Sequence, residues 1–263
     1  MKKIILLLAL GFLCQPLYPQ RTEYPQIGAQ VFIEPGQTDK QIDGFFRILA
    51  QHGFETARIR MFGAHMLRPD GLWDFTLYDK AFDAAGKHGV KLFATLFPPT
   101  DELGDVGGFK FPRSKAHLLE IADYIEAVVS HFRGHPALDT WVLQNEPGTG
   151  GTGPGRNDLT DEVFARWKAA QKTPAYDNGY LKADFTQERF HTDFTTWYLG
   201  WIASQVDLHD PAHHKHINPH QLLDNLTDYD FPAYEGFLTS LGVSMHLSWH
   251  FGYFTRAQYP LGI

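Results

Sequence analysis

An amide and a carboxylate, Asn145 and Glu146, stand together at the end of a predicted strand. The segment 140–143 has the composition of a buried strand, whereas Pro147 and Gly148 cannot continue one. A carboxyl group at such a strand end can be partly removed from water, which raises its pKa and lets it hold a proton for a leaving group. The alternative for the same residues is a surface loop whose glutamate caps a helix.

The segments before Glu146 alternate between strands and helices. We expect strands over 27–33, 56–62 and 90–97 and from Thr140, with helices over 39–50, 77–88 and 118–132. This alternation is typical of a parallel sheet with crossover helices. It fits a (β/α)8 barrel or a doubly wound sheet, but no Gly-x-Gly-x-x-Gly follows the first strand, which disfavours a dinucleotide-binding fold.

The pattern continues after Glu146 with less regularity. A Gly-rich loop over 148–158 precedes predicted helices at 161–170 and 190–206, and the aromatic stripe of the second indicates burial. We expect a short strand at 216–220, a helix over 231–241 and a sixth strand at 243–251. The fold class predicted is therefore α/β, a (β/α)8 barrel of which about six βα units are present.

Composition narrows the classes of function. The chain has 263 residues, 43% of them hydrophobic and 14% aromatic, enough for one large folded domain. Its formal net charge of −7 and the absence of a basic stripe make nucleic acid an improbable partner. Cys14 is the only cysteine, so no disulfide framework is expected. The cluster His213, His214 and His216 lacks a helical i, i+4 pair and a nearby carboxylate, so we expect no metal site and no cofactor.

The N-terminus has the pattern of a signal peptide. Lys2 and Lys3 precede an apolar run over 4–13 that is too short to span a bilayer. We assign residues 1–20 to the leader and 21–263 to the barrel domain, and expect a secreted or periplasmic protein with no membrane span. Lipid attachment at Cys14 is disfavoured because Leu13, rather than a small residue, precedes it.

From about Ile27 onward the chain resembles the clan A glycoside hydrolases, which are retaining (β/α)8 barrels. The segment 54–58 resembles the second strand of the clan, which ends in an arginine beside the nucleophile. His-Pro-Ala-Leu at 135–138, then Trp141 and Asn-Glu-Pro at 145–147, resemble the approach to the fourth strand. Within the clan, 28–36 and 190–218 look most like the family 42 β-galactosidases.

This resemblance implies roles for individual residues. Glu146 would be the general acid/base, Asn145 would hold the sugar 2-hydroxyl, and Arg58 would keep the nucleophile ionised by its fixed charge. We expect Arg60 to point to the opposite face of its strand. The polar residues at later strand ends are candidates for substrate binding, namely Asn218, His220, His246, Trp249 and His250.

The chain departs from the clan at the nucleophile, a glutamate expected at the end of the seventh strand. The glutamates after Glu146 are Glu162, Glu188 and Glu235, all in helical or pre-helical stretches. We therefore expect a barrel that stops before the seventh strand, in a fragment or truncated product.

Three readings remain open. The first is a β-glycosidase, galactoside- or mannoside-directed, that acts on an oligo- or polysaccharide by double displacement. The second is a non-catalytic carbohydrate-binding barrel remnant. The third is a doubly wound α/β binding protein in which Glu146 is incidental.

Overall fold

The computed structural model describes residues 26–99, 111–147, 155–219 and 229–242. The predicted leader at 1–20 lies outside these residues, and so do His220, His246, Trp249 and His250 and the predicted strand at 243–251.

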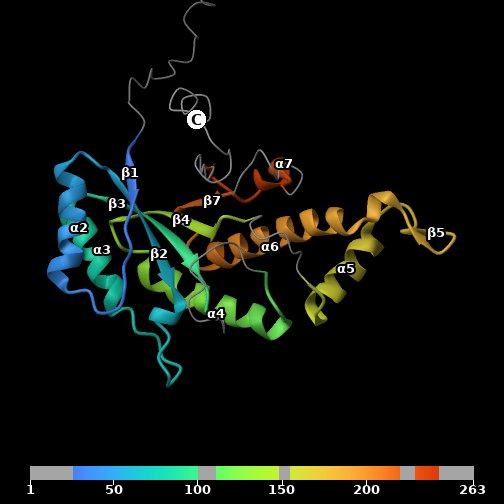
Figure 1. The fold of residues 1–263 in the computed structure, drawn as a ribbon, viewed down its shortest axis with the longest axis horizontal. Coiled ribbons are helices and arrows are strands. Elements are labelled where there is room, and N and C mark those ends of the chain that lie inside the picture. Colours follow the sequence, from blue (N-terminus) through green and yellow to red (C-terminus); the bar gives the residue numbers. More distant parts are fainter. Residues whose placement is uncertain (1–25, 100–110, 148–154, 220–228, 243–263) are drawn as a thin grey trace, which may run out of the picture.

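Six parallel strands form one sheet in the order of the chain (Figure 1). They are β1 (Gly28–Gln30), β2 (Thr56–Phe62), β3 (Lys91–Phe97), β4 (Leu138–Asn145), β7 (His214–Asn218) and β8 (Ser240–Leu241). A doubly wound sheet reverses its strand order part-way, whereas a barrel adds each new strand beside the last. The sheet is therefore a partial (β/α)8 barrel, and the doubly wound reading was wrong.

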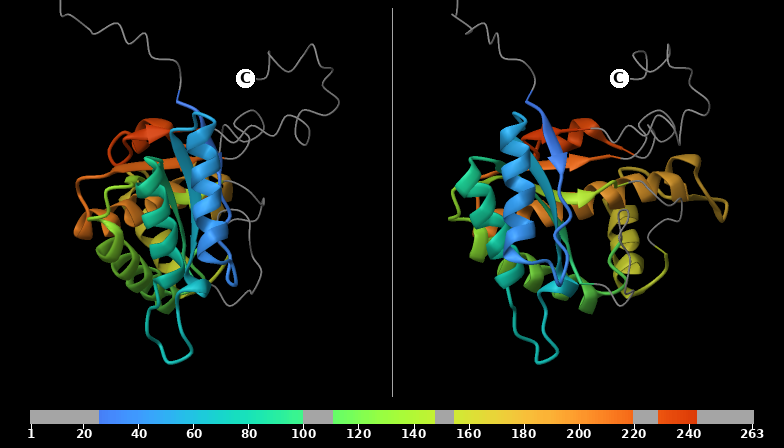
Figure 2. Two further views of the ribbon diagram at one scale, coloured as in Figure 1. Left: turned by 90° about the vertical axis from the view of Figure 1, so that its left-hand side faces the viewer. Right: turned by 60° about the vertical axis from the view of Figure 1, so that its left-hand side comes forward.

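Helices cover the outer face of this sheet (Figure 2). They are α2 (Asp39–Gln51), α3 (Thr76–His88), α4 (Lys115–Phe132) and α6 (Gln187–His209). Residues of β2 alternate between half-buried and buried, so Ala57, Ile59 and Met61 pack under the helices while the residues between them face the barrel interior.

Local chemistry sets the helix ends. Thr38 and Gln41 form a reciprocal capping box at the start of α2, and Ser114 caps α4 by accepting from the His117 amide. Gly89 ends α3 with φ of 72°, a conformation that glycine adopts without steric cost.

An insertion separates β4 from α6. Helix α5 (Asp158–Ala170) is followed by a two-stranded hairpin of β5 (Tyr176–Asp177) and β6 (Tyr180–Leu181). In Figure 1 this insertion projects from the barrel beyond the end of α6. The predicted helix at 161–170 is confirmed and begins three residues earlier.

The segment 231–241 was predicted incorrectly as one helix. Helix α7 covers only Phe231–Tyr234, and β8 follows at Ser240–Leu241. The Thr239 amide and the Gly242 amide donate to carbonyls of β7, Lys215 and Ile217 respectively. Pairing with the edge of the sheet outweighs the weak helical periodicity of this segment, so β8 forms within residues predicted to be helical.

The core lies between sheet and helices and includes the largest side chain of β4. Trp141 is fully buried, and its indole Nε1 donates to Asp210 Oδ2 at 2.8 Å, at the end of α6. Within the described ranges, no helix combines the length and apolar character needed to cross a membrane.

Candidate active site

Arg58 joins three strands at the inner face of the barrel. Its Nε donates to Thr95 Oγ1 of β3 at 2.8 Å, and one terminal nitrogen donates to Asn145 Oδ1 of β4 at 2.6 Å and to Asn218 Oδ1 of β7 at 3.2 Å. The three predicted residues Arg58, Asn145 and Asn218 are thus brought together. Since both amide oxygens accept from Arg58, each amide turns its NH2 group away from the arginine.

An extra residue in β4 aims Asn145 inward. Val142 pairs with His216 and Asn145 pairs with Asn218, so three steps along β4 match two steps along β7. Simple alternation would send the Asn145 side chain to the face opposite Val142, but the irregularity turns both to the interior. The contact between Asn145 and Arg58 depends on this irregularity.

Glu146 follows directly and has an unusual backbone. Its φ is 49°, in the left-handed region that non-glycine residues seldom adopt. Pro147 is buried, and the hydroxyl of Tyr229 donates to its carbonyl. Tyr229 therefore helps to fix the turn that carries Glu146, a role that its sequence context did not reveal.

Arg60 was placed on the wrong face by the sequence analysis. Side chains two apart on a strand share a face, and Arg60 lies on the interior side with Arg58. Its guanidinium carbon lies 5.2 Å from the centre of the Phe32 ring and 5.6 Å from that of Phe97. The two-residue spacing was the signal that could have placed it.

The charges of the site act on one another. Burial lowers the pKa of Arg58 to about 10, with repulsion from Arg60 adding to the decrease and attraction to Glu146 opposing it. Burial also lowers the pKa of Arg60, while Glu146 and Glu34 oppose that change. Both arginines remain charged near neutrality.

Glu34 is a second carboxylate that the sequence analysis missed. It lies just beyond β1, and its Oε2 is 4.0 Å from His65 Nε2. Residues 34–36 read Glu-Pro-Gly, the same tripeptide as residues 146–148. The sequence therefore contains two glutamates that are followed by Pro-Gly at the end of a strand, and only Glu146 was predicted to be a site residue.

His216 occupies the interior beside this group. Its Nδ1 lies 2.9 Å from Ser240 Oγ, and its ring meets Phe93 edge-on at 6.1 Å. Burial, with a smaller contribution from the Arg58 charge, lowers the pKa of His216 from 6.5 to about 4. The imidazole is therefore neutral across the physiological range. The described residues contain no group of three His, Cys, Asp or Glu side chains arranged to hold a metal ion.

The lowered pKa of His216 predicts a dependence of stability on pH. The unfolded chain takes up a proton at this residue near pH 6.5, whereas the folded chain does so only near pH 4. The free energy of unfolding should therefore fall as the pH falls from about 6.5 toward 4, and His216 should add no pH dependence above that window. We expect His216→Gln to flatten this part of the curve of melting temperature against pH.

Other acid-sensitive groups contribute to the same curve, so the comparison needs a matched variant. His52 is exposed at the end of α2, and His52→Gln should leave the slope as it is in the unaltered chain. Equal slopes in all three proteins between pH 4 and 6.5 would show that His216 is not the group responsible.

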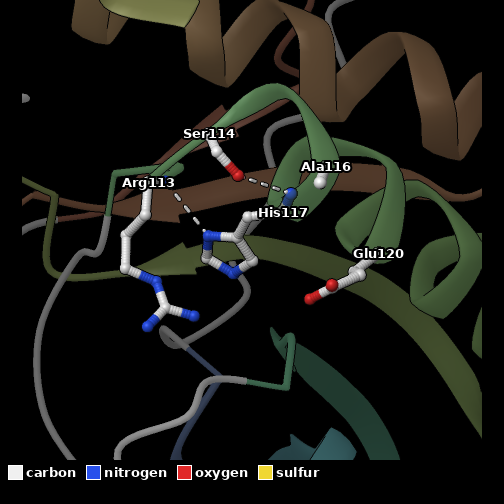
Figure 3. A pocket seen from close by; sticks show the side chains of 5 residues that line it. All are labelled: Arg113, Ser114, Ala116, His117 and Glu120. Atoms are coloured by element: carbon white, nitrogen blue, oxygen red, sulfur yellow. Dashed lines mark hydrogen bonds between the residues drawn. The ribbon is translucent and has the colours of Figure 1, made fainter. Parts of the chain in front are cut away.

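A separate polar pocket marks the start of α4 (Figure 3). The Arg113 amide donates to His117 Nδ1 at 3.1 Å, and the His117 amide donates to Ser114 Oγ at 3.1 Å. The side chains of Arg113, His117 and Glu120 line the same pocket. Its hydrogen bonds serve to begin the helix, and none of the predicted site residues lines it.

Comparisons with known proteins agree with this architecture. No protein-family model matches the chain. Among solved structures, a β-galactosidase from Halorubrum lacusprofundi superposes with a TM-score of 0.69 at 18% identity, over 89% of this chain and 42% of the other. A family 42 β-galactosidase from G. stearothermophilus gives a TM-score of 0.66 at 16% identity, over 91% of this chain and 43% of the other.

Curated relatives point to the same clan. A probable mannan endo-1,4-beta-mannosidase F from Aspergillus flavus is 32% identical over 168 residues, which is 52% of this chain and 34% of the relative. The same enzyme name belongs to a Neosartorya fischeri protein that is 35% identical over 108 residues, 37% of this chain and 22% of the relative. The resemblance to the clan A glycoside hydrolases is confirmed.

The matches cover only part of each known protein. The glycoside hydrolase-like chain spans about a third or less of the length of these mannosidases and 42–43% of these β-galactosidases. The identity to the solved structures is low, so they establish the fold.

Proposed function

We propose that this chain provides the acid/base half of a retaining β-glycosidase site, directed at β-linked galactosides or mannosides. Glu146 is the general acid/base, Asn145 and Asn218 bind sugar hydroxyls, and Arg58 orients both amides. The leader predicted at 1–20 supports export from the cell. The curated relatives, named as enzymes of mannan, support a polysaccharide substrate.

One observation carries the proposal. A single arginine holds two asparagine side chains from separate strands, and the carboxylate of Glu146 follows one of them at the turn that closes β4. In an enzyme barrel, chemistry is built at the carboxyl ends of the strands. Asn145 and Asn218 are the last residues of β4 and β7, and Arg58 reaches them from the third residue of β2. If Arg58 served only to form a structural ion pair, it would not need hydrogen bonds to the side chains of Asn145 and Asn218.

The chemistry requires a second carboxylate. In the first step Glu146 gives its proton to the glycosidic oxygen as that bond breaks, and a carboxylate about 5 Å away forms the glycosyl–enzyme bond. In the second step Glu146 takes a proton from water, and the water oxygen displaces the enzyme carboxylate from the sugar. The resemblance places the nucleophile on a seventh barrel strand, a part of the barrel that the described residues do not include.

Hydrolysis tests the proposal directly. The purified chain is incubated with aryl β-galactosides, aryl β-mannosides and mannan, and the anomer released first is read by proton NMR. We expect the chain alone to bind these sugars without turnover, and a barrel completed by a seventh strand that carries the nucleophilic glutamate to hydrolyse them with retention of the β configuration. Inversion would refute the double displacement. Binding of these sugars without any turnover by the completed barrel as well would favour the carbohydrate-binding remnant instead.

A further inference from the structure

A groove on the insertion after Glu146 has the size and the lining of a second binding site. Its cavity measures about 460 Å³, within the range of small-molecule sites. It lies between α5, the β5–β6 hairpin and α6, and its principal lining residues are Arg156, Asp161, Phe164, Lys168, Tyr176 and Phe190.

The groove combines an accessible ring with several polar groups. Tyr176 is 49% exposed. Lys168 Nζ lies 4.5 Å from the centre of the Phe164 ring and 5.2 Å from that of Tyr176, and it donates to the Tyr176 hydroxyl at 3.3 Å. The ammonium group therefore holds the tyrosine ring at the groove wall, where an apolar face and hydrogen-bonding groups are offered side by side.

The lining of the groove also includes a pair of opposite charges. Arg156 Nε lies 3.3 Å from Asp161 Oδ1, and both side chains are largely exposed. An arginine and a carboxylate together offer donors and acceptors in a small space. Sugars present apolar C–H faces and a rim of hydroxyl groups that both donate and accept, so their chemistry matches this lining.

The position of the groove fits a long substrate. The Lys115 amide at the start of α4 donates to Asp158 Oδ1 at 3.4 Å, and the Lys115 side chain pairs with Glu162 of α5. Helices of a (β/α)8 barrel run antiparallel to its strands, so the start of α4 lies at the end of the barrel where the strands terminate. The start of α5 is thus fixed at the same end as Glu146, and the groove extends outward from there.

We propose that this groove binds outlying sugar units of a neutral β-linked hexose polysaccharide whose scissile bond lies at Glu146, and this rests on the proposed function. The groove gives the chain a preference for long substrates, because a short glycoside seated at Glu146 does not reach it. Tyr176 is the residue that contacts the outlying sugar.

The hairpin provides a matched pair of tyrosines for the test. Tyr176 lines the groove, whereas Tyr180, on the paired strand of the same hairpin, is 80% exposed and is not among the lining residues. Binding of mannohexaose and of β-1,4-galactohexaose is measured by isothermal titration calorimetry for the unaltered chain, Tyr176→Ala and Tyr180→Ala. We expect Tyr176→Ala to raise the Kd for the sugar that binds by roughly fivefold, as an aromatic contact of this kind accounts for about 1 kcal/mol. Tyr180→Ala should leave the Kd unchanged.

Three results would contradict the proposal that the groove binds sugar. The first is equal affinity in Tyr176→Ala and the unaltered chain, the second is an equal loss of affinity in Tyr176→Ala and Tyr180→Ala, and the third is no binding of either hexasaccharide. Melting temperatures of the variants identify a hairpin that has unfolded, and Tyr176→Phe, which keeps the ring, should then retain most of the affinity.

An aryl β-monoglycoside separates the two proposals. Its hydrolysis by the completed barrel depends on Glu146 and should not respond to Tyr176→Ala, whereas Tyr176-dependent binding without any hydrolysis by the completed barrel would refute the proposed function and leave the groove standing.

Discussion

In a barrel completed by a seventh strand with its glutamate, Glu146→Gln should lower the hydrolysis of β-glycosides with unactivated leaving groups by about a hundredfold to ten-thousandfold. Glutamine keeps the shape of the side chain but cannot transfer a proton to the departing oxygen. The loss should be much smaller with a dinitrophenyl glycoside, whose leaving group needs little protonation. Initial rates on the two substrates, at equal protein concentration, give the comparison.

Glu162→Gln is the control for this experiment. Glu162 lies on the surface of α5 and pairs with Lys115 and Arg166, so its loss should leave both rates near those of the unaltered chain. If Glu146→Gln reduced the two substrates by the same factor, Glu146 would not act as the acid. If it reduced neither, the site would have to be sought elsewhere in the barrel.

Trp141→Ala is expected to lower the free energy of unfolding by about 3–5 kcal/mol. The indole fills a fully buried position on the strand that carries Asn145, so truncation leaves a large cavity. It also removes the donor at 2.8 Å from Asp210, a carboxylate that is 3% exposed. His213 Nδ1 lies 2.7 Å from the same carboxylate oxygen, and the amides of Ala212 and His213 donate to the other, so Asp210 keeps these partners.

A second variant separates the two contributions. Trp141→Phe fills most of the space but has no N–H, and we expect it to cost about 1–3 kcal/mol, the range for a buried acceptor that loses its donor. Leu119→Ala, at a position on α4 that is 66% exposed, should change the free energy by less than about 0.5 kcal/mol. Urea denaturation followed by circular dichroism measures all three, and a Trp141→Ala variant as stable as Leu119→Ala would show that the indole does not hold β4 in place.

Much of the architecture was predictable because it depends on local patterns. The alternation of strand and helix, the stripe of α4 and the glycine after α3 each follow from a few neighbouring residues, and the structure confirms them. The segment 231–241 was mispredicted because its conformation depends on β7, a partner that lies earlier in the chain.

The candidate site was predictable in part. Asn145, Glu146 and Arg58 were found from their motifs, yet the reason why Asn145 meets Arg58 is a register shift between β4 and β7, which no short window of sequence contains. Asn218 was assigned to sugar binding, but its contact with Arg58 joins residues 160 positions apart and could not be foreseen. Arg60 and Glu34, by contrast, followed from rules that were available, the two-residue period of a strand and a repeated Glu-Pro-Gly.

At Glu146 the backbone conformation favours glycine for stability, whereas the proposed activity needs the carboxylate. A left-handed φ of 49° costs a glutamate on the order of 1 kcal/mol or more, and glycine accepts the same angle without that penalty. Laboratory selection for heat resistance would therefore drift toward glycine at this one position and lose the carboxylate, whereas selection on sugar release would retain the acid and tolerate the weaker fold.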